Sequence, residues 1–140
     1  MEVTSPRPKL VSFRATSFHG ENNVVSTGQE PWNIELAQTM EVGTGTPQNT
    51  SLPLQAFVKI GLIAKASKTD DKNQVAEFKA NYEAKFEFPL NVTEEMVLPL
   101  IKQELFQYVL VAQAFPLAMT HFRREMQSMG FDARNLPLGL

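Results

Sequence analysis

Residues 76–88 read Ala-Glu-Phe-Lys-Ala-Asn-Tyr-Glu-Ala-Lys-Phe-Glu-Phe, and apolar and polar residues alternate through almost all of this stretch. Because successive side chains of a strand point to opposite faces of a sheet, the alternation predicts one long strand with an apolar face and a polar face. Such a strand belongs to an antiparallel sheet whose apolar face must be covered by another part of the chain. The remaining sequence must therefore supply that cover.

Three further segments have the pattern of strands, and they span residues 10–18, 32–42 and 54–65. In the third of these, Phe57 and Ile63 lie opposite the other apolar residues, which predicts burial on both sides near its middle. The polar run 68–73 predicts a hairpin between this strand and the strand of 76–88.

The apolar period changes from two residues to that of a helix after Pro89. Thr93 is the predicted N-cap of a first helix, because two acidic residues and then apolar residues at helical spacing follow it. Pro116 is expected to break or kink this run, and a second helix is expected from Pro116 to Met129, with Gly130 as its stop.

The fold class that follows is α+β, a four-stranded antiparallel sheet followed by two C-terminal helices that pack against one face. We expect a single domain over residues 1–140, with a flexible start at 1–8 and an apolar tail at 136–140. Four long strands and two helices leave apolar surface uncovered, which favours a homo-oligomer.

The composition of the 140-residue chain excludes several classes of function. The net charge of −2 gives no electrostatic case for nucleic acid or an anionic membrane as partner. There is no cysteine, which excludes disulfides and thiolate chemistry and makes the cytoplasm the simpler location. No apolar run approaches the roughly 20 residues that span a bilayer.

The side chains that carry chemistry show no catalytic or metal-binding pattern. His19 and His121 have no second ligand at metal-binding spacing, and no serine lies in a Gly-x-Ser-x-Gly turn. The Gly-Thr-Gly stretch 43–45 has neither the lysine nor the helix start of a phosphate-binding loop. We therefore expect no catalytic residue, no metal and no cofactor, and an enzyme is the least supported class.

Methionine and phenylalanine of the last predicted helix recur at spacings of three and four residues, at Met119, Phe122, Met126 and Met129. Two interpretations remain open for them: ordinary core packing, or an adaptable groove that re-packs around varied partners. The apolar tail is hard to bury wholly in a small two-helix domain, and it favours an exposed apolar binding surface.

Three short stretches resemble the SecB-type chaperones, and the resemblance spans roughly residues 9–140. Glu-Pro-Trp-Asn-Ile-Glu-Leu at 30–36 resembles the Trp-containing approach to the second strand of that family. Ala-Phe-Pro-Leu-Ala at 114–118 resembles the family's Leu-Phe-Pro-Tyr-Ala, where the second helix begins. Ser-Met-Gly-Phe at 128–131, followed by Leu-Pro-Leu at 136–138, resembles the family's helix exit and apolar tail.

The resemblance implies a SecB-like fold, a homotetramer built as a dimer of dimers, and binding of unfolded or aggregation-prone polypeptides without ATP. It implies long grooves lined by the second strand, the connecting segment before it and the last helix. The implied client-binding positions are Trp32, Ile34, Leu36, Phe122, Met126, Met129 and Phe131.

The sequence departs from the family members that deliver clients to the SecA motor in protein export. Ala80 stands at or beside their acidic position on the strand of 76–88, the chain stops at Leu140 without their extended tail, and Met119-Thr120 replaces their Arg-Glu. SecB-like proteins also act as dedicated chaperones of toxin–antitoxin systems. The sequence therefore favours an antitoxin client over general export. Both roles are expectations from the resemblance.

Two other classes of function are left open. The first is a carrier of a small apolar ligand, held in a cavity between the sheet and the helices. The second is a structural oligomer that uses up its apolar face in self-assembly. A ligand extracted with organic solvent would indicate the carrier, and a self-buried face would not bind a hydrophobic dye.

Overall fold

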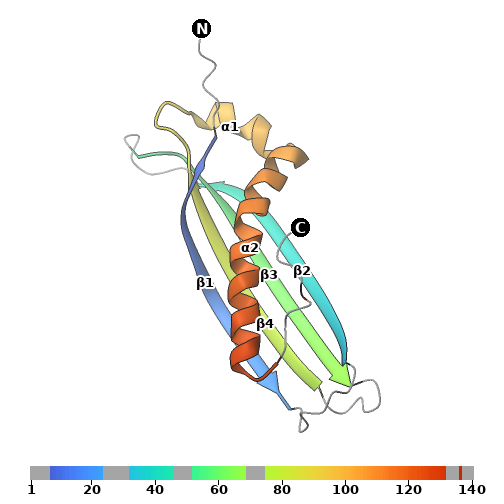
Figure 1. Cartoon of the computed structure of the whole chain (residues 1–140). Helices are drawn as coiled ribbons and strands as arrows, with labels where there is room; N and C mark the ends of the chain where they lie inside the picture. Colours follow the sequence, from blue (N-terminus) through green and yellow to red (C-terminus); the bar gives the residue numbers. More distant parts are fainter. Residues whose placement is uncertain (1–6, 24–31, 46–51, 69–74, 132–135, 137–140) are drawn as a thin grey trace.

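The structure is a computed structural model that describes residues 7–23, 32–45, 52–68, 75–131 and 136. Its elements are β1 (Lys9–Asn22), β2 (Trp32–Gly45), β3 (Gln55–Lys68), β4 (Val75–Glu87), α1 (Glu94–Ile101) and α2 (Glu104–Ser128) (Figure 1). The predicted order of four strands followed by two helices is confirmed. Most of the predicted flexible start and apolar tail lies outside the described residues, and the single domain stays a prediction.

The four strands form one antiparallel sheet in the order β1-β4-β3-β2. The stretch that decides the fold, 76–88, falls almost entirely on β4, which pairs with β1 on one side and β3 on the other. Its alternate apolar residues from Ala76 to Phe86 are at most 2% exposed. The predicted apolar and polar faces of this strand are therefore both present.

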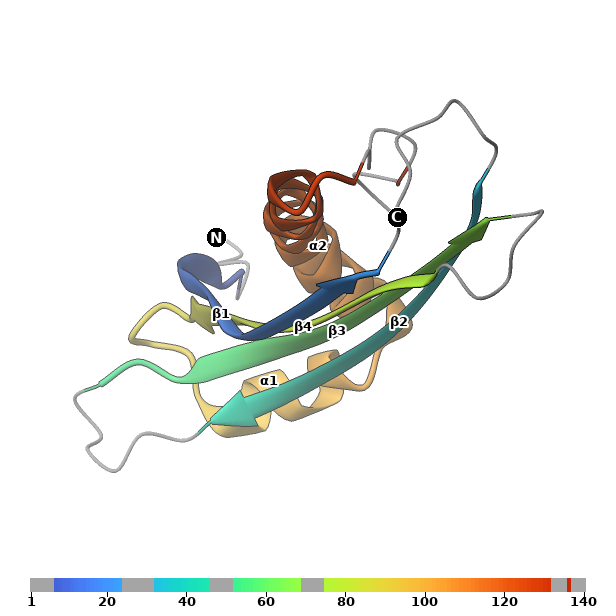
Figure 2. The ribbon, with the colours of Figure 1, turned by 90° about the horizontal axis from the view of Figure 1, so that it is seen from below.

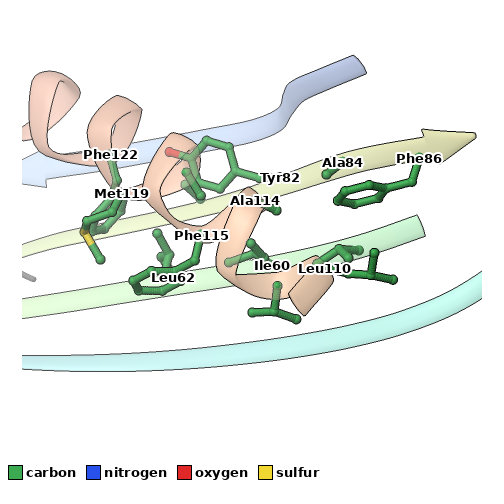
Figure 3. Close-up of a cluster of buried hydrophobic side chains, with 14 of the residues drawn as sticks. Ile60, Leu62, Tyr82, Ala84, Phe86, Leu110, Ala114, Phe115, Met119 and Phe122 are labelled. Atoms are coloured by element: carbon green, nitrogen blue, oxygen red, sulfur yellow. The ribbon is translucent and has the colours of Figure 1, made fainter. Parts of the chain in front are cut away.

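Helix α2 lies against one face of the sheet, which we call the helix face (Figure 2). Leu110, Ala114, Phe115, Met119 and Phe122 of α2 meet side chains of β3 and β4 there (Figure 3). The opposite face, which we call the open face, carries the alternate residues of each strand, and its described side chains are all exposed or half-buried. Phe57 and Ile63 lie on the open face and are half-buried, so the prediction that β3 is buried on both sides is wrong for the single chain.

The break between the helices lies at Lys102 and Gln103, not at Pro116 as predicted. Pro116 lies inside α2, where it removes one backbone donor from the helix. The flanking residues Phe115 and Ala118 are buried against the sheet, and this packing holds the helix together through the proline. Thr120 also donates its hydroxyl to the Pro116 carbonyl at 2.7 Å.

The C-terminal end of α2 has the predicted glycine stop. Gly130 has a positive φ of 83°, which only glycine adopts without strain. The Gly130 N–H donates to the Gln127 carbonyl and the Phe131 N–H donates to the Met126 carbonyl, both at 3.0 Å. This pair of bonds is a Schellman motif, and it turns the chain back toward the sheet.

In the described part of the chain, α2 is the one helix whose length and apolar composition would let it cross a membrane. A helix packed in a protein core has the same properties. Eight side chains of α2 are buried, so core packing accounts for one apolar side of this helix.

Strand β1 continues through Gly20 to Asn22, past the predicted end at residue 18. The continuation depends on a close approach: a Cβ at Gly20 would lie 2.6 Å from the Met129 sulfur and 2.9 Å from the Phe78 ring. The Asn22 side-chain amide also donates to the Met129 carbonyl at 2.9 Å. The hydrogen bond and the close approach therefore hold the end of β1 against Met129, the residue that follows α2.

We expect Gly20→Ala to destabilise the fold by about 1–3 kcal/mol, because the added methyl group must displace the Met129 and Phe78 side chains. The matched control is Gly43→Ala in β2, where a Cβ would meet no atom within 4 Å. That variant should stay within about 0.5 kcal/mol of wild type. Urea unfolding followed by circular dichroism measures both, and equal midpoints for the two variants would contradict the close approach.

Candidate functional site

The structure brings the predicted client-binding residues to one end of the sheet, where β2 begins and α2 ends. In register, Leu36 on β2 is followed across the sheet by Ala64 and then Phe78. The Phe78 ring lies 5.8 Å from the Phe131 ring, which follows α2. Met129 reaches the same place above Gly20. The second strand and the helix exit thus lie at the same end of the sheet, and β3 lies between β2 and the strands that the helix exit contacts.

These residues differ sharply in exposure. Ile34, Leu36 and Met129 are half-buried, so part of each side chain is accessible. Phe131 is 7% exposed. Phe122 and Met126 are 0% exposed, so they line the core beneath the surface and do not reach it. Trp32 begins β2, but its side chain lies outside the described part of the structure. A client-binding role for all seven stays a prediction.

The half-buried apolar row of β2 continues beyond Leu36 along the helix face. Met40 and Val42 are half-buried, and Gln38, between Leu36 and Met40, is exposed. In register, this row adjoins the buried row of β3 that includes Leu62. Apolar side chains of β2 therefore form a partly open continuation of the core at the margin of the sheet.

The backbone of β2 offers a second kind of binding group. All fourteen residues of β2 pair with β3 without a register shift, and no described strand pairs with its other edge. The opposite edge strand, β1, is interrupted by two register shifts, at Leu10/Ser12 and Ala15/Ser17. Bulges and short interruptions protect an edge from pairing, so β2 is the edge better suited to accept an extended polypeptide.

The structure also shows a second apolar surface, which the sequence reasoning missed. It lies on the outer sides of the helices, where the exposed apolar residues are Met96, Leu98, Leu105, Tyr108, Val109 and Leu117. We call this set the outer helix patch. A hollow of about 300 Å³ lies beside it, with Leu105, Phe106 and Val109 in its lining.

The helical spacing of the outer helix patch is visible in the sequence, and the same spacing is typical of the core-facing side of a helix. Leu105 is 76% exposed and Tyr108 is 53% exposed, although both fall at the expected spacing for the apolar face. Two apolar faces of one helix cannot be separated by periodicity alone when the sheet covers only one of them. No signal in the sequence marks which face the sheet takes.

A polar cluster fixes the middle of α2 to the sheet. The Tyr82 hydroxyl and the His121 Nδ1 are hydrogen-bonded at 2.8 Å, and His121 Nε2 lies 3.6 Å from a Glu125 carboxylate oxygen. Burial, with a smaller contribution from the charge of Glu125, raises the pKa of Tyr82 well above its usual value. Phe13 stacks on the Tyr82 ring at 5.6 Å, and Phe18 meets the His121 ring edge-on at 6.4 Å.

The role of this cluster is structural, because it holds α2 on the sheet. A tyrosine that keeps its proton at neutral pH can hydrogen-bond His121 but is a poor nucleophile. The described part of the chain holds no group of three or more His, Cys, Asp or Glu side chains that could bind a metal ion. What the site offers instead is apolar side-chain surface beside the edge of β2, with which no described strand pairs.

The arrangement of sheet and helices is the fold of the SecB-like chaperones. The solved structure of Rv1957 from Mycobacterium tuberculosis, a SecB-like chaperone in complex with a ChAD peptide from the Rv1956 HigA1 antitoxin, matches with a TM-score of 0.65. The match covers 94% of this chain and 90% of that chain, at 13% sequence identity. No protein-family model and no curated protein matches the sequence.

Proposed function

We propose that this protein is an ATP-independent chaperone that holds unfolded or aggregation-prone polypeptides. The observation that carries the proposal is the half-exposed apolar row of β2 beside a fourteen-residue strand edge that no described strand covers. The SecB-like fold supports it. The proposal includes no enzymatic activity, and a cytoplasmic location stays a prediction from the sequence.

The physical basis of binding is modest at each contact. Each client segment would gain roughly 25 cal/mol for every Å² of apolar surface that it buries. Backbone hydrogen bonds to the β2 edge are independent of the client's sequence, because every residue except proline carries the same donor and acceptor. Weak contacts of this kind become tight when several copies of the chain hold one client.

Self-association is the second part of the proposal, as a dimer of dimers. The outer helix patch supports it, because six large apolar side chains exposed on two helices favour a contact with another molecule. Native mass spectrometry would test it. A purely monomeric chain at micromolar concentration would contradict this part of the proposal and leave client binding to be judged separately.

The direct test follows the refolding of a chemically unfolded client in the presence of stoichiometric chaperone. We expect refolding to be slowed or blocked, with no effect of added ATP. Serum albumin in place of the chaperone controls for general crowding. Normal refolding of several aggregation-prone clients, including proteins encoded next to this chain, would contradict the chaperone function.

The client class is the finer part of the proposal. The antitoxin peptide bound to Rv1957 supports an antitoxin client, although protein export remains the alternative use of this fold. Copurification from the native host distinguishes the two. One antitoxin-like partner would support the dedicated role, whereas many presecretory proteins together with SecA would support export.

A carrier of a small apolar ligand is the second candidate function. The hollow beside the outer helix patch favours it, because Phe106 and Leu110 contribute apolar walls and Gln103 and Gln113 contribute polar groups. Organic extraction of the purified protein followed by mass spectrometry tests it. A stoichiometric apolar compound would favour the carrier, and its absence would favour the chaperone.

A further inference from the structure

The helix-face row of β2 over residues 34–42 contains one polar residue among four apolar ones. In chain order the row is Ile34, Leu36, Gln38, Met40 and Val42. The four apolar side chains are half-buried, whereas Gln38 is exposed. The cross-strand neighbours of the row on β3 are all apolar and at most 1% exposed, namely Ala66, Ala64, Leu62, Ile60 and Val58. Gln38 is therefore the one polar side chain in an apolar strip that is two strands wide.

The Gln38 side chain has hydrogen-bonding capacity that the described part of the chain does not use. Its amide carries two N–H donors and a carbonyl acceptor. Among the described residues, none forms a hydrogen bond with this amide. Because Gln38 is exposed, water is free to bond it in the unoccupied protein. A client that covers the row displaces this water and must replace its hydrogen bonds.

An extended client at the β2 edge meets this row with every second side chain. In such complexes the backbone pairing provides affinity, and the alternate side chains provide specificity. Five alternate side chains of a nine-residue client segment would lie opposite the row. Because two apolar residues lie on each side of Gln38, the row has the same pattern in both chain directions. One client pattern therefore suits both a parallel and an antiparallel alignment.

The amide makes some alignments of a client less favourable than others. An apolar side chain opposite Gln38 leaves the donors and the acceptor without partners, whereas a glutamine or asparagine there pairs with both. A slip of two residues places an apolar side chain on Gln38 and the client's amide on Leu36 or Met40. A slip of one residue turns the other side of the client toward the row. A single polar residue in an apolar seam fixes the register of coiled coils in the same way.

We propose that Gln38 determines the specificity of the β2 site. It selects extended client segments in which a glutamine or asparagine lies midway along nine residues of alternating apolar pattern, and it fixes their register. The inference rests on the proposed client binding at β2 and names the client chemistry of that site. The fold itself has no described use for the amide, because Gln38 is exposed and its neighbours are apolar.

The test compares two labelled peptides of identical composition by fluorescence anisotropy. Both contain nine residues that alternate between one row of five and intervening serines, with Gly-Ser flanks. In the matched peptide the row is Val-Val-Gln-Val-Val, and in the slipped peptide it is Val-Gln-Val-Val-Val. We expect wild type to bind the matched peptide roughly five- to tenfold more tightly, because only that peptide pairs the Gln38 amide while covering the whole row.

Two variants at position 38 show whether the amide causes this preference. Gln38→Met keeps an unbranched side chain of similar length and removes the amide, so the two peptides should bind within about twofold of each other. Gln38→Asn keeps the amide on a shorter side chain and should retain a preference for the matched peptide. Equal binding of the two peptides by wild type, or an undiminished preference in Gln38→Met, would overturn the inference.

The matched control is Asn33→Leu, which also replaces an exposed amide of β2 by an apolar side chain. Residue 33 lies on the open face, so the variant should keep the full preference for the matched peptide. Circular dichroism checks that each variant folds. A loss of the preference in Asn33→Leu would show that it depends on the general polarity of β2, which would also contradict the role of Gln38.

The refolding assay on the same samples distinguishes this inference from the chaperone function. If wild type slows client refolding but binds both peptides equally, the role of Gln38 fails and the chaperone function stands. If wild type neither slows refolding nor binds either peptide, the chaperone function fails and the inference that rests on it fails too. If it prefers the matched peptide but slows no refolding, the selective β2 site stands without the chaperone function.

Discussion

We expect a chain that carries both Ile34→Thr and Leu36→Thr to bind an unfolded client roughly 5- to 30-fold more weakly than wild type. The two side chains lie on β2 at the end of the sheet where α2 exits, and both are half-buried. Threonine is β-branched and suits a strand, so the substitution removes apolar surface without breaking β2. Fluorescence anisotropy of a labelled client peptide would measure the affinity.

The size of the effect follows from the surface that the client would cover. Full burial of a leucine or isoleucine side chain contributes about 1.5–3 kcal/mol, and at most about a third of each side chain remains to be buried by a client. Together the two residues should contribute about 1–2 kcal/mol, and each 1.4 kcal/mol is a factor of ten in affinity. The loss should be the same for unrelated clients, because no specific pairing is involved.

The matched control is a double variant at two exposed apolar positions away from this site, Val11→Thr on β1 and Leu52→Thr before β3. It removes as much accessible apolar surface, since Val11 is 47% exposed and Leu52 is 55% exposed. We expect its client affinity to stay within about twofold of wild type, as the affected side chains touch no client. An equal loss in both double variants would mean that clients bind apolar surface without a defined site.

The sequence predicts most of the fold because the strongest pattern lies on the most constrained strand. β4 pairs on both sides and packs beneath α2, so its side chains must alternate strictly, and the stretch 76–88 shows this without the structure. The edge strands β1 and β2 are less constrained. The passage of β1 through Gly20 depends on its close approach to Met129, and no local pattern records that approach or the two register shifts of β1.

The predicted break between the two helices is wrong for a related reason. Local rules place a break at Pro116, but the packing of Phe115 and Ala118 on the sheet outweighs the lost backbone hydrogen bond. The bond between Tyr82 and His121 joins residues 39 positions apart, and neither residue type alone predicts it. Tertiary contacts decide these features, and such contacts cannot be inferred from the local pattern of a single sequence.

The client-binding role of the seven residues stays a prediction, and the structure shows that they differ in depth. Resemblance to the SecB-type family placed residues of β2 and of the α2 exit together, and the structure brings them together at one end of the sheet. The resemblance could not distinguish Met129, which is half-buried, from Met126, which lies three residues earlier and is fully buried. That difference depends on how α2 is rotated about its axis on the sheet.

The second large effect is expected at Phe122, where Phe122→Ala should lower the free energy of unfolding by about 3–5 kcal/mol. The side chain is 0% exposed, and its ring lies 6.2 Å from that of Phe18 on β1, which it meets edge-on. Removing the ring leaves a cavity between α2 and the sheet that the surrounding structure fills only in part. Because domains of this size are stable by roughly 5–15 kcal/mol, the loss should be plain in urea unfolding.

Phe122 is also one of the predicted client-binding residues, and a conservative variant separates the two roles. Phe122→Leu keeps an apolar side chain in the core and should cost less than about 1.5 kcal/mol, so the protein stays folded. If Phe122 acts only from within the core, client affinity should stay within about twofold of wild type, in contrast to the loss expected for the Ile34 and Leu36 pair. A tenfold loss of client affinity in folded Phe122→Leu would show that clients reach this ring. Since the ring has no exposed surface, such access would require α2 to move away from the sheet when a client binds.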